Sequence, residues 1–165
     1  MTIKNDKIRI LGKGITALAL KDKFPNATLY DDKDFENYDL QSEELTVVSP
    51  GIPPYNNMVL NSKNVVSDYD LFEDIIPFSI WISGTNGKTT TTQMCQHLLN
   101  EYNSVCGGNI GIPLSHMDEK APIWILETSS FTLHYTNKSK PNIYLLLPIS
   151  EDHITWHGSF KEYQD

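Results

Sequence analysis

The stretch "IWISGTNGKTTTTQMCQH" (residues 80–97) joins a short apolar run to a glycine loop and a threonine-rich helix start. A strand that leads through such a loop into a helix directs backbone N–H groups, a lysine and a helix N-terminus at one anion. The general phosphate-loop pattern G-x-x-x-x-G-K-[ST] requires a glycine five places before Gly87, but Ile82 stands there. The local pattern therefore leaves two interpretations, a nucleotide-phosphate site or a glycine turn with a solvated lysine.

On both sides of this loop, short apolar runs alternate with helical patterns, which is typical of parallel sheets with crossover helices. Before the loop, we expect strands at 7–11, 27–31 and 45–52, a helix at 15–24, and a short strand and turn at 64–72. From residue 78 onward, we expect strands at 78–83, 122–127 and 142–149, a helix at 89–102, and a helix or turn at 129–136. The sequence thus predicts an α/β fold with a Rossmann-like parallel sheet in residues 1–77. The start of a P-loop-type α/β domain follows in residues 78–165.

Composition narrows the class of function. The formal net charge of −8 over 165 residues argues against a nucleic-acid partner, because such binding rests on clustered Lys and Arg. No apolar run approaches the roughly 18 residues of a membrane span, and "MTIKNDKIRI" (1–10) lacks the long apolar core of a signal peptide. With only two cysteines, the chain suits a reducing cytoplasm and no membrane partner.

Three segments, the opening loop among them, place polar residues after predicted strands, where open parallel sheets bind ligands. Lys88 and Thr89 suit the phosphates and the magnesium of a bound nucleotide, and Glu127 at a strand end can hold magnesium or be an exposed strand-end acid. "ISEDHITWH" (149–157) offers His153 for magnesium or substrate, or is a solvated polar turn. Zinc is disfavoured there, because neither an HExxH frame nor a cysteine pair accompanies the histidines.

The other glycine loops are less specific. "GKGITA" (12–17), with Asp31 and Asp32 closing the next strand, fits a dinucleotide fingerprint or a tight turn needed only for packing. "GGNIGIP" (107–113) exposes Asn109 or forms a bulge, and "SPGIPP" (49–54) is an N–H-lined turn or a simple chain reversal.

Together these blocks resemble the Mur ligase family, the ATP-dependent amide-forming enzymes of peptidoglycan assembly. The family writes its phosphate loop G-[ST]-N-G-K-[ST], and "GTNGKT" (84–89) matches every position. Ile82 is therefore no departure from that pattern. The remaining matching blocks, which occur in the same order along nearly all of the chain, are "GKGITA", "SPGI", "SDYDLF", "GGNIGIP", "LETSSFTL" and "ISEDH".

The resemblance implies a role for each matching residue. The uridine nucleotide of the substrate would occupy a pocket made by Ile15, Thr16, Asp31, Asp32, Lys33 and Gly51, while Asn109 and Ser129 would contact the substrate nearer its reacting end. The ATP phosphates would be held by Gly84, Thr85, Asn86, Gly87, Lys88, Thr89 and Thr90. Magnesium would be bound by Thr89, Glu127 and His153, and the catalytic set would be Lys88, Asn109, Glu127 and His153.

The implied reaction adds D-glutamate to UDP-N-acetylmuramoyl-L-alanine. ATP phosphorylates the alanine carboxylate, and the amine then displaces phosphate from the acyl phosphate. The resemblance also implies a bacterial, cytoplasmic enzyme, and we expect a monomer. The cofactors would be ATP and Mg²⁺. Family members have three domains, so we expect this chain to stop inside the second, to leave a sheet edge exposed and to lack ligase activity alone.

Three alternatives stay open. "GKGITA" and Asp31 alone favour an NAD- or nucleotide-binding Rossmann module. "GTNGKTT" (84–90) alone favours a P-loop phosphotransferase acting on a small metabolite. Another ligase of the same family would share the phosphate loop, so the choice of D-glutamate rests on the resemblance.

Overall fold

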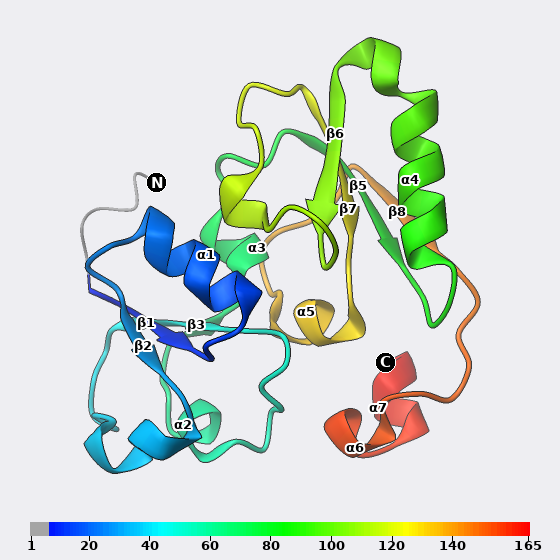
Figure 1. Ribbon diagram of the computed structural model, residues 1–165. Helices are drawn as coiled ribbons and strands as arrows, with labels where there is room; N and C mark the ends of the chain where they lie inside the picture. The colour runs from blue at the N-terminus through cyan, green and yellow to red at the C-terminus, as the bar shows by residue number, and fades with distance from the viewer. Residues whose placement is uncertain (1–6) are drawn as a thin grey trace.

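Two four-stranded sheets, both entirely parallel, organise the computed structural model, which describes residues 7–165 (Figure 1). We predicted no signal peptide from residues 1–10, and residues 1–6 of that segment lie outside the described residues. The strands are β1 Ile8–Leu11, β2 Thr28–Tyr30, β3 Leu45–Val48, β4 Val65–Val66, β5 Phe78–Ser83, β6 Ser104–Gly108, β7 Ile123–Glu127 and β8 Ile143–Leu146. The α-helices are α1 Ile15–Lys23, α2 Asn57–Leu60, α3 Asp68–Leu71, α4 Lys88–Leu98, α5 Ser130–Tyr135, α6 Ile154–His157 and α7 Phe160–Gln164. Three 3₁₀ helices complete the list: η1 Asp32–Asn37, η2 Asn100–Tyr102 and η3 Leu114–His116.

The first sheet has the strand order β2-β1-β3-β4, so β1 lies between two parallel neighbours. All four residues of β1 are buried, as expected for a strand covered on both faces. Its register pairs Ile8 with Leu45 of β3 and Arg9 with Thr28 of β2. Because β1 and β3 are parallel neighbours, the loops that follow them lie side by side at the carboxyl ends of the strands.

The second sheet has the strand order β6-β7-β5-β8, with β5 and β7 paired at its centre. Helix α4 lies against β5, β6 and β7. β6 and β8 are the two edge strands, and all four residues of β8 are exposed. The predicted α/β class with two parallel sheets is thus confirmed, and the expected exposed edge lies at β8.

Some predicted bounds were wrong. The segment 64–72 is a two-residue strand followed by helix α3, because the Ser67 hydroxyl accepts a hydrogen bond from the Asp70 N–H and caps a helix start. β3 ends at Val48, before Pro50, and β8 ends at Leu146, before Pro148. In both cases the chain beyond the strand becomes a loop. The loop after β3 lines the cavity described below, and the loop after β8 packs against Gly84.

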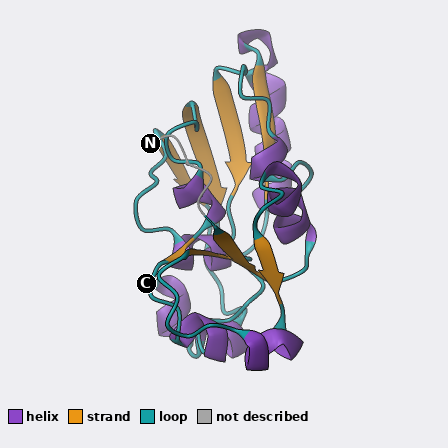
Figure 2. Ribbon diagram, turned by 90° about the vertical axis from the view of Figure 1, so that its left-hand side faces the viewer, coloured by secondary structure: helices purple, strands orange, loops and turns teal. Residues whose placement is uncertain are grey.

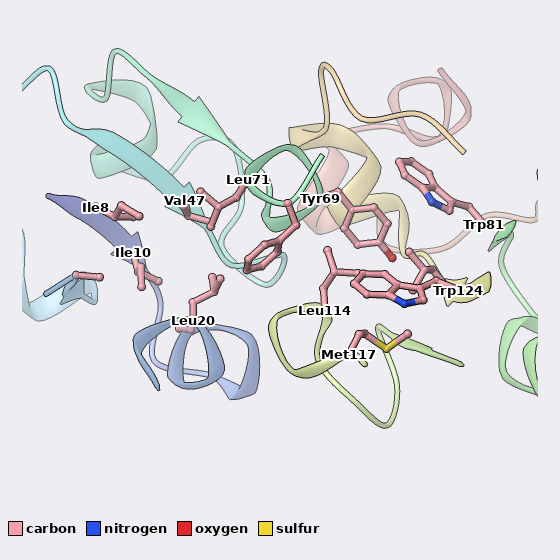
Figure 3. Packing of buried hydrophobic residues seen from close by; sticks show 14 of the residues in the cluster. Ile8, Ile10, Leu20, Val47, Tyr69, Leu71, Trp81, Leu114, Met117 and Trp124 are labelled. Atoms are coloured by element: carbon pink, nitrogen blue, oxygen red, sulfur yellow. The ribbon is translucent and has the colours of Figure 1, made fainter. Parts of the chain in front are cut away.

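One continuous core packs side chains from both sheets (Figure 3). Leu20 of α1 and Ile10 of β1 belong to the same buried cluster as Trp81 of β5 and Trp124 of β7. Tyr69 of α3 lies between them, with its ring edge-on to Trp81 at 4.7 Å between centroids. Figure 2 shows the two sheets one above the other. Within residues 7–165, no helix is long and apolar enough to cross a membrane.

Candidate functional site

The loop between β5 and α4 is a tight turn that depends on two glycines. Gly84 and Gly87 have φ values of 134° and 85°, which side-chain-bearing residues rarely adopt. A Cβ at Gly84 would lie 2.7 Å from the Cβ of Leu147. Glycine at this position therefore lets the loop pack directly against the segment that follows β8.

Lys88, the first residue of α4, folds back over this loop. Its Nζ donates to the carbonyl oxygens of Gly84 at 2.6 Å and Thr85 at 3.0 Å. The Thr85 hydroxyl in turn bonds to the Ser150 backbone N–H at 2.9 Å and to the Tyr163 hydroxyl at 2.8 Å. The ammonium group is thus held at the loop, while Asn86, Gly87, Thr89 and Thr90 are exposed around it.

Glu127, at the end of β7, is the buried acid of the site. Its side chain is almost entirely buried, at 2% exposure, and both of its oxygens are occupied. Thr89 donates to Oε2 at 2.8 Å, and the Asn109 side-chain amide donates to Oε1 at 2.9 Å. Asn109 also donates its backbone N–H to the Glu127 carbonyl at 2.8 Å. The structure therefore brings together one residue from each of three predicted segments.

The close approach of the Asn109 loop depends on glycine. Gly108 has a φ of 98°, and a Cβ there would lie 2.6 Å from the Glu127 carbonyl oxygen. The carboxylate of Glu127 and the hydroxyl of Thr89 are hard oxygen donors of the kind that Mg²⁺ prefers. This pair fits the implied magnesium.

His153, the third predicted magnesium ligand, has other neighbours. It is the residue before α6 and has a left-handed backbone, φ 54°, and its ring packs against Phe131 at 4.8 Å between centroids. Its Nδ1 is 3.5 Å from Asp152 Oδ1, and within residues 7–165 no hydrogen bond or ion pair joins it to Glu127. His157 bonds through Nε2 to the Ser130 hydroxyl at 3.0 Å, and burial lowers the pKa of its imidazole. The described residues contain no metal-binding cluster of three or more His, Cys, Asp or Glu side chains.

A cavity of about 520 Å³ lies between the loops of the two sheets. The loops that line it follow β1, β3 and β6, and α3 and α5 close it. Of the predicted substrate residues, the lining includes Ile15, Thr16, Gly51 and Asn109.

The other predicted substrate residues do not line this cavity. Asp31 accepts hydrogen bonds from Lys13, at 2.9 Å, and from the Lys33 backbone, and these bonds lower the pKa of its carboxyl. Asp32 accepts a hydrogen bond from Asn56. Ser129 caps α5 by accepting the Thr132 N–H at 3.1 Å. Asp31 therefore reaches the cavity only through Lys13, which does line it.

Sequence reasoning missed several cavity residues, including Lys13, Asp68 and Tyr69. Lys13 is the variable residue of "GKG", and a pattern that specifies only glycines assigns it no role. Asp68 and Tyr69 lie in "SDYDLF", a block that was matched to the family without any role for its residues. The tyrosine hydroxyl reaches the Thr128 side chain at 3.1 Å, a contact between segments about sixty residues apart.

Known bacterial proteins resemble this chain along nearly all of its length. Residues 82–165 match the family model described as "Mur ligase middle domain". The chain is 50% identical over 175 residues to the "UDP-N-acetylmuramoylalanine--D-glutamate ligase" of Campylobacter jejuni strain 81-176, and 45% identical over 184 residues to the protein of that name from Helicobacter pylori strain J99. Each alignment covers 95% of this chain, but only 44% and 43% of the relatives. The chain thus spans less than half the length of these relatives.

A solved structure supports the fold alone. It is the "UDP-N-acetylmuramate:L-alanyl-gamma-D-glutamyl-meso-diaminopimelate ligase (MPL) from Neisseria meningitides", with a TM-score of 0.53 and 18% sequence identity. The match covers 96% of this chain and 65% of that one.

Proposed function

The chain belongs to the Mur ligase family, and from that membership we propose that it carries the substrate-nucleotide and ATP-phosphate sites of a ligase that adds D-glutamate to UDP-N-acetylmuramoyl-L-alanine. The observation that carries this proposal is the convergence of Thr89, Asn109 and Glu127. Thr89 follows the glycine loop, and Asn109 borders the cavity of about 520 Å³. Glu127 is hydrogen-bonded to both. A phosphate donor and a nucleotide-linked acceptor can meet there.

Residues 1–77 would bind the uridine nucleotide, and residues 78–165 would bind the ATP phosphates through Gly84–Thr90. Lys88 would exchange its two carbonyl partners for phosphate oxygens, because an ammonium group bonds more strongly to an anion than to a neutral carbonyl. Asn109 would contact the substrate beside Glu127. The remaining predicted contacts, at Asp31, Asp32, Lys33 and Ser129, would require these residues to reach the ligand from outside the cavity lining.

Thr89 and Glu127 would hold magnesium, with His153 as a third ligand after movement of the loop before α6. Bound there, Mg²⁺ would neutralise charge on the transferring phosphoryl group. The substrate carboxylate would attack the γ-phosphorus of ATP and release ADP. The D-glutamate amine would then attack the acyl carbon and release phosphate, leaving an amide. We further propose a monomer in the bacterial cytoplasm, where the two free thiols of the chain would stay reduced.

A ligand series on this chain tests the proposal. Thermal unfolding is measured alone and with UDP-N-acetylmuramoyl-L-alanine, UDP, NAD, or ATP with Mg²⁺. A ligand at 100 times its dissociation constant stabilises the folded state by about 2.7 kcal/mol, so a bound ligand raises the melting temperature measurably. We expect shifts with the UDP compounds and with ATP plus Mg²⁺, and none with NAD. A shift with NAD alone would replace this function with that of a dinucleotide-binding module.

A further inference from the structure

Asp68 presents a buried carboxylate oxygen without a partner at the wall of the cavity. The residue is only 7% exposed, and no hydrogen bond reaches its Oδ1 within the described part of the chain. It is the first residue of α3 and lines the cavity together with Ser49, which follows β3. The Ser49 hydroxyl is likewise buried without a partner. Two residues from different elements, each with a buried unpartnered oxygen, thus line the same cavity.

The neighbours of Asp68 have structural partners. Ser67 caps α3, the Tyr69 hydroxyl bonds to Thr128, and the Asp70 carboxylate accepts three backbone N–H groups. Asp68 differs from them, because its Oδ1 has no partner. Burial raises the pKa of its carboxyl to about 6, and the nearby backbone N–H groups of Asp68 and Tyr69 oppose the rise. A buried oxygen without a partner destabilises a fold. A ligand that donates a hydrogen bond would remove that penalty.

The position of Asp68 indicates which part of a ligand it meets. The adjacent Tyr69 reaches the carbonyl of Glu127 at 3.5 Å. Lys13 and the "GKG" loop line the same cavity from the connection between β1 and α1. A nucleotide-sugar that extends from that loop toward Glu127 carries its diphosphate and then its amino sugar across this space. The diphosphate is anionic and would be repelled by a carboxylate. The amino sugar carries hydroxyls and an acetamido N–H, which are donors.

We propose that Asp68 is a substrate-binding residue that accepts a hydrogen bond from a hydroxyl or the acetamido N–H of the amino sugar. This inference rests on the proposed function, because it assumes that the cavity holds a uridine-diphosphate amino sugar. It adds selectivity for the sugar to a pocket in which Ile15, Thr16 and Gly51 are predicted to contact the nucleotide.

Calorimetric titration of this chain with UDP-N-acetylmuramoyl-L-alanine and with UDP tests the inference. For Asp68→Ala we expect roughly tenfold weaker binding of the amino-sugar compound, since hydrogen bonds to charged groups are among the strong ones, and unchanged binding of UDP. Asp68→Asn, which keeps a neutral acceptor, should fall between. Glu73→Gln is the matched control, because it removes the same charge from an exposed position five residues later and should bind both compounds like wild type.

The melting temperature of the free protein separates binding from a structural role. An amide is easier to bury than a carboxylate, so Asp68→Asn should melt no lower than wild type, whereas a structural carboxylate would make it melt lower. If wild type binds the amino-sugar compound and Asp68→Ala binds it equally well, the inference is wrong and the proposed function stands. Equal weakening of UDP binding would also overturn it, because the partner would then be the nucleotide. If wild type binds neither compound, the proposed function fails and the inference fails with it.

Discussion

The Lys88 ammonium bonds to two carbonyl oxygens of its own loop, at Gly84 and Thr85. These bonds hold the charge at the loop before any nucleotide arrives, so little side-chain freedom has to be lost on binding. The loop itself is anchored through Thr85, whose hydroxyl bonds to Ser150 and Tyr163. At the residue scale, the proposed phosphate site is therefore a preformed turn with one cation held against it.

Replacing Lys88 tests that cation. We expect Lys88→Ala to weaken the binding of ATP with Mg²⁺ by at least about tenfold, because it removes a charge-assisted hydrogen bond to phosphate. Calorimetric titration of this chain measures the change. Lys140→Ala is the control, since that lysine is exposed in the loop before β8. Equal ATP affinity for wild type and Lys88→Ala would return the loop to a glycine turn with a solvated lysine.

Helix α3 is one of the elements that connect the two sheets. It follows β4 of the first sheet, and its residues bond to segments after β7 of the second. The Asp70 carboxylate accepts the backbone N–H groups of Asn137, Lys138 and Ser139, each at 2.8 Å. The Ser67 hydroxyl accepts a hydrogen bond from the Thr136 hydroxyl at 2.9 Å. A four-residue helix has little stability of its own, so these contacts hold it in place.

Asp70→Ala should therefore destabilise the protein by about 2 kcal/mol, because three N–H groups lose a charged acceptor that is partly exposed to solvent. The midpoint of urea unfolding measures the change, and hydrogen exchange at residues 137–139 should accelerate. Glu73→Ala, at an exposed position beside α3, should change stability by no more than about 0.5 kcal/mol. An unchanged midpoint for Asp70→Ala would show that the three hydrogen bonds to Asp70 do not stabilise the contact between α3 and residues 137–139.

At the scale of the whole molecule, the buried cluster that contains Leu20, Tyr69 and Trp124 ties the two predicted domains to one core (Figure 3). The cavity lies between their loops, so its shape depends on how the two sheets pack. We infer that residues 7–165 unfold as one cooperative unit.

Leu20→Ala tests this cooperativity. Removing a fully buried leucine from α1 should cost about 2–5 kcal/mol. All three tryptophans lie after residue 78, so their fluorescence reports on the part that does not contain Leu20. We expect the tryptophan midpoint in urea to fall together with the midpoint from far-ultraviolet circular dichroism. Leu18→Ala, on the exposed face of the same helix, should leave both midpoints near wild type. A tryptophan midpoint that does not move would mean that the sheets unfold independently.

The sequence by itself determined the parallel α/β class, the glycine loop and most strand positions, because apolar periodicity and glycine spacing are local signals. It also singled out Lys88, Thr89, Asn109 and Glu127 as candidates. It could not show that three of these residues share a hydrogen-bond network, since their separations along the chain say nothing about distance.

Only the tertiary structure decided which predicted residues meet. Thr89 and Asn109 both donate hydrogen bonds to Glu127. His153 instead packs against Phe131, and Asp31 forms an ion pair with Lys13. The tertiary structure also revealed the unpartnered oxygen of Asp68, which looks like an ordinary helix-start acid in the sequence. The physical reason is that burial and hydrogen-bond partners come from elements distant in the chain. Strand order and the packing of the two sheets set these distances, and no local pattern encodes them.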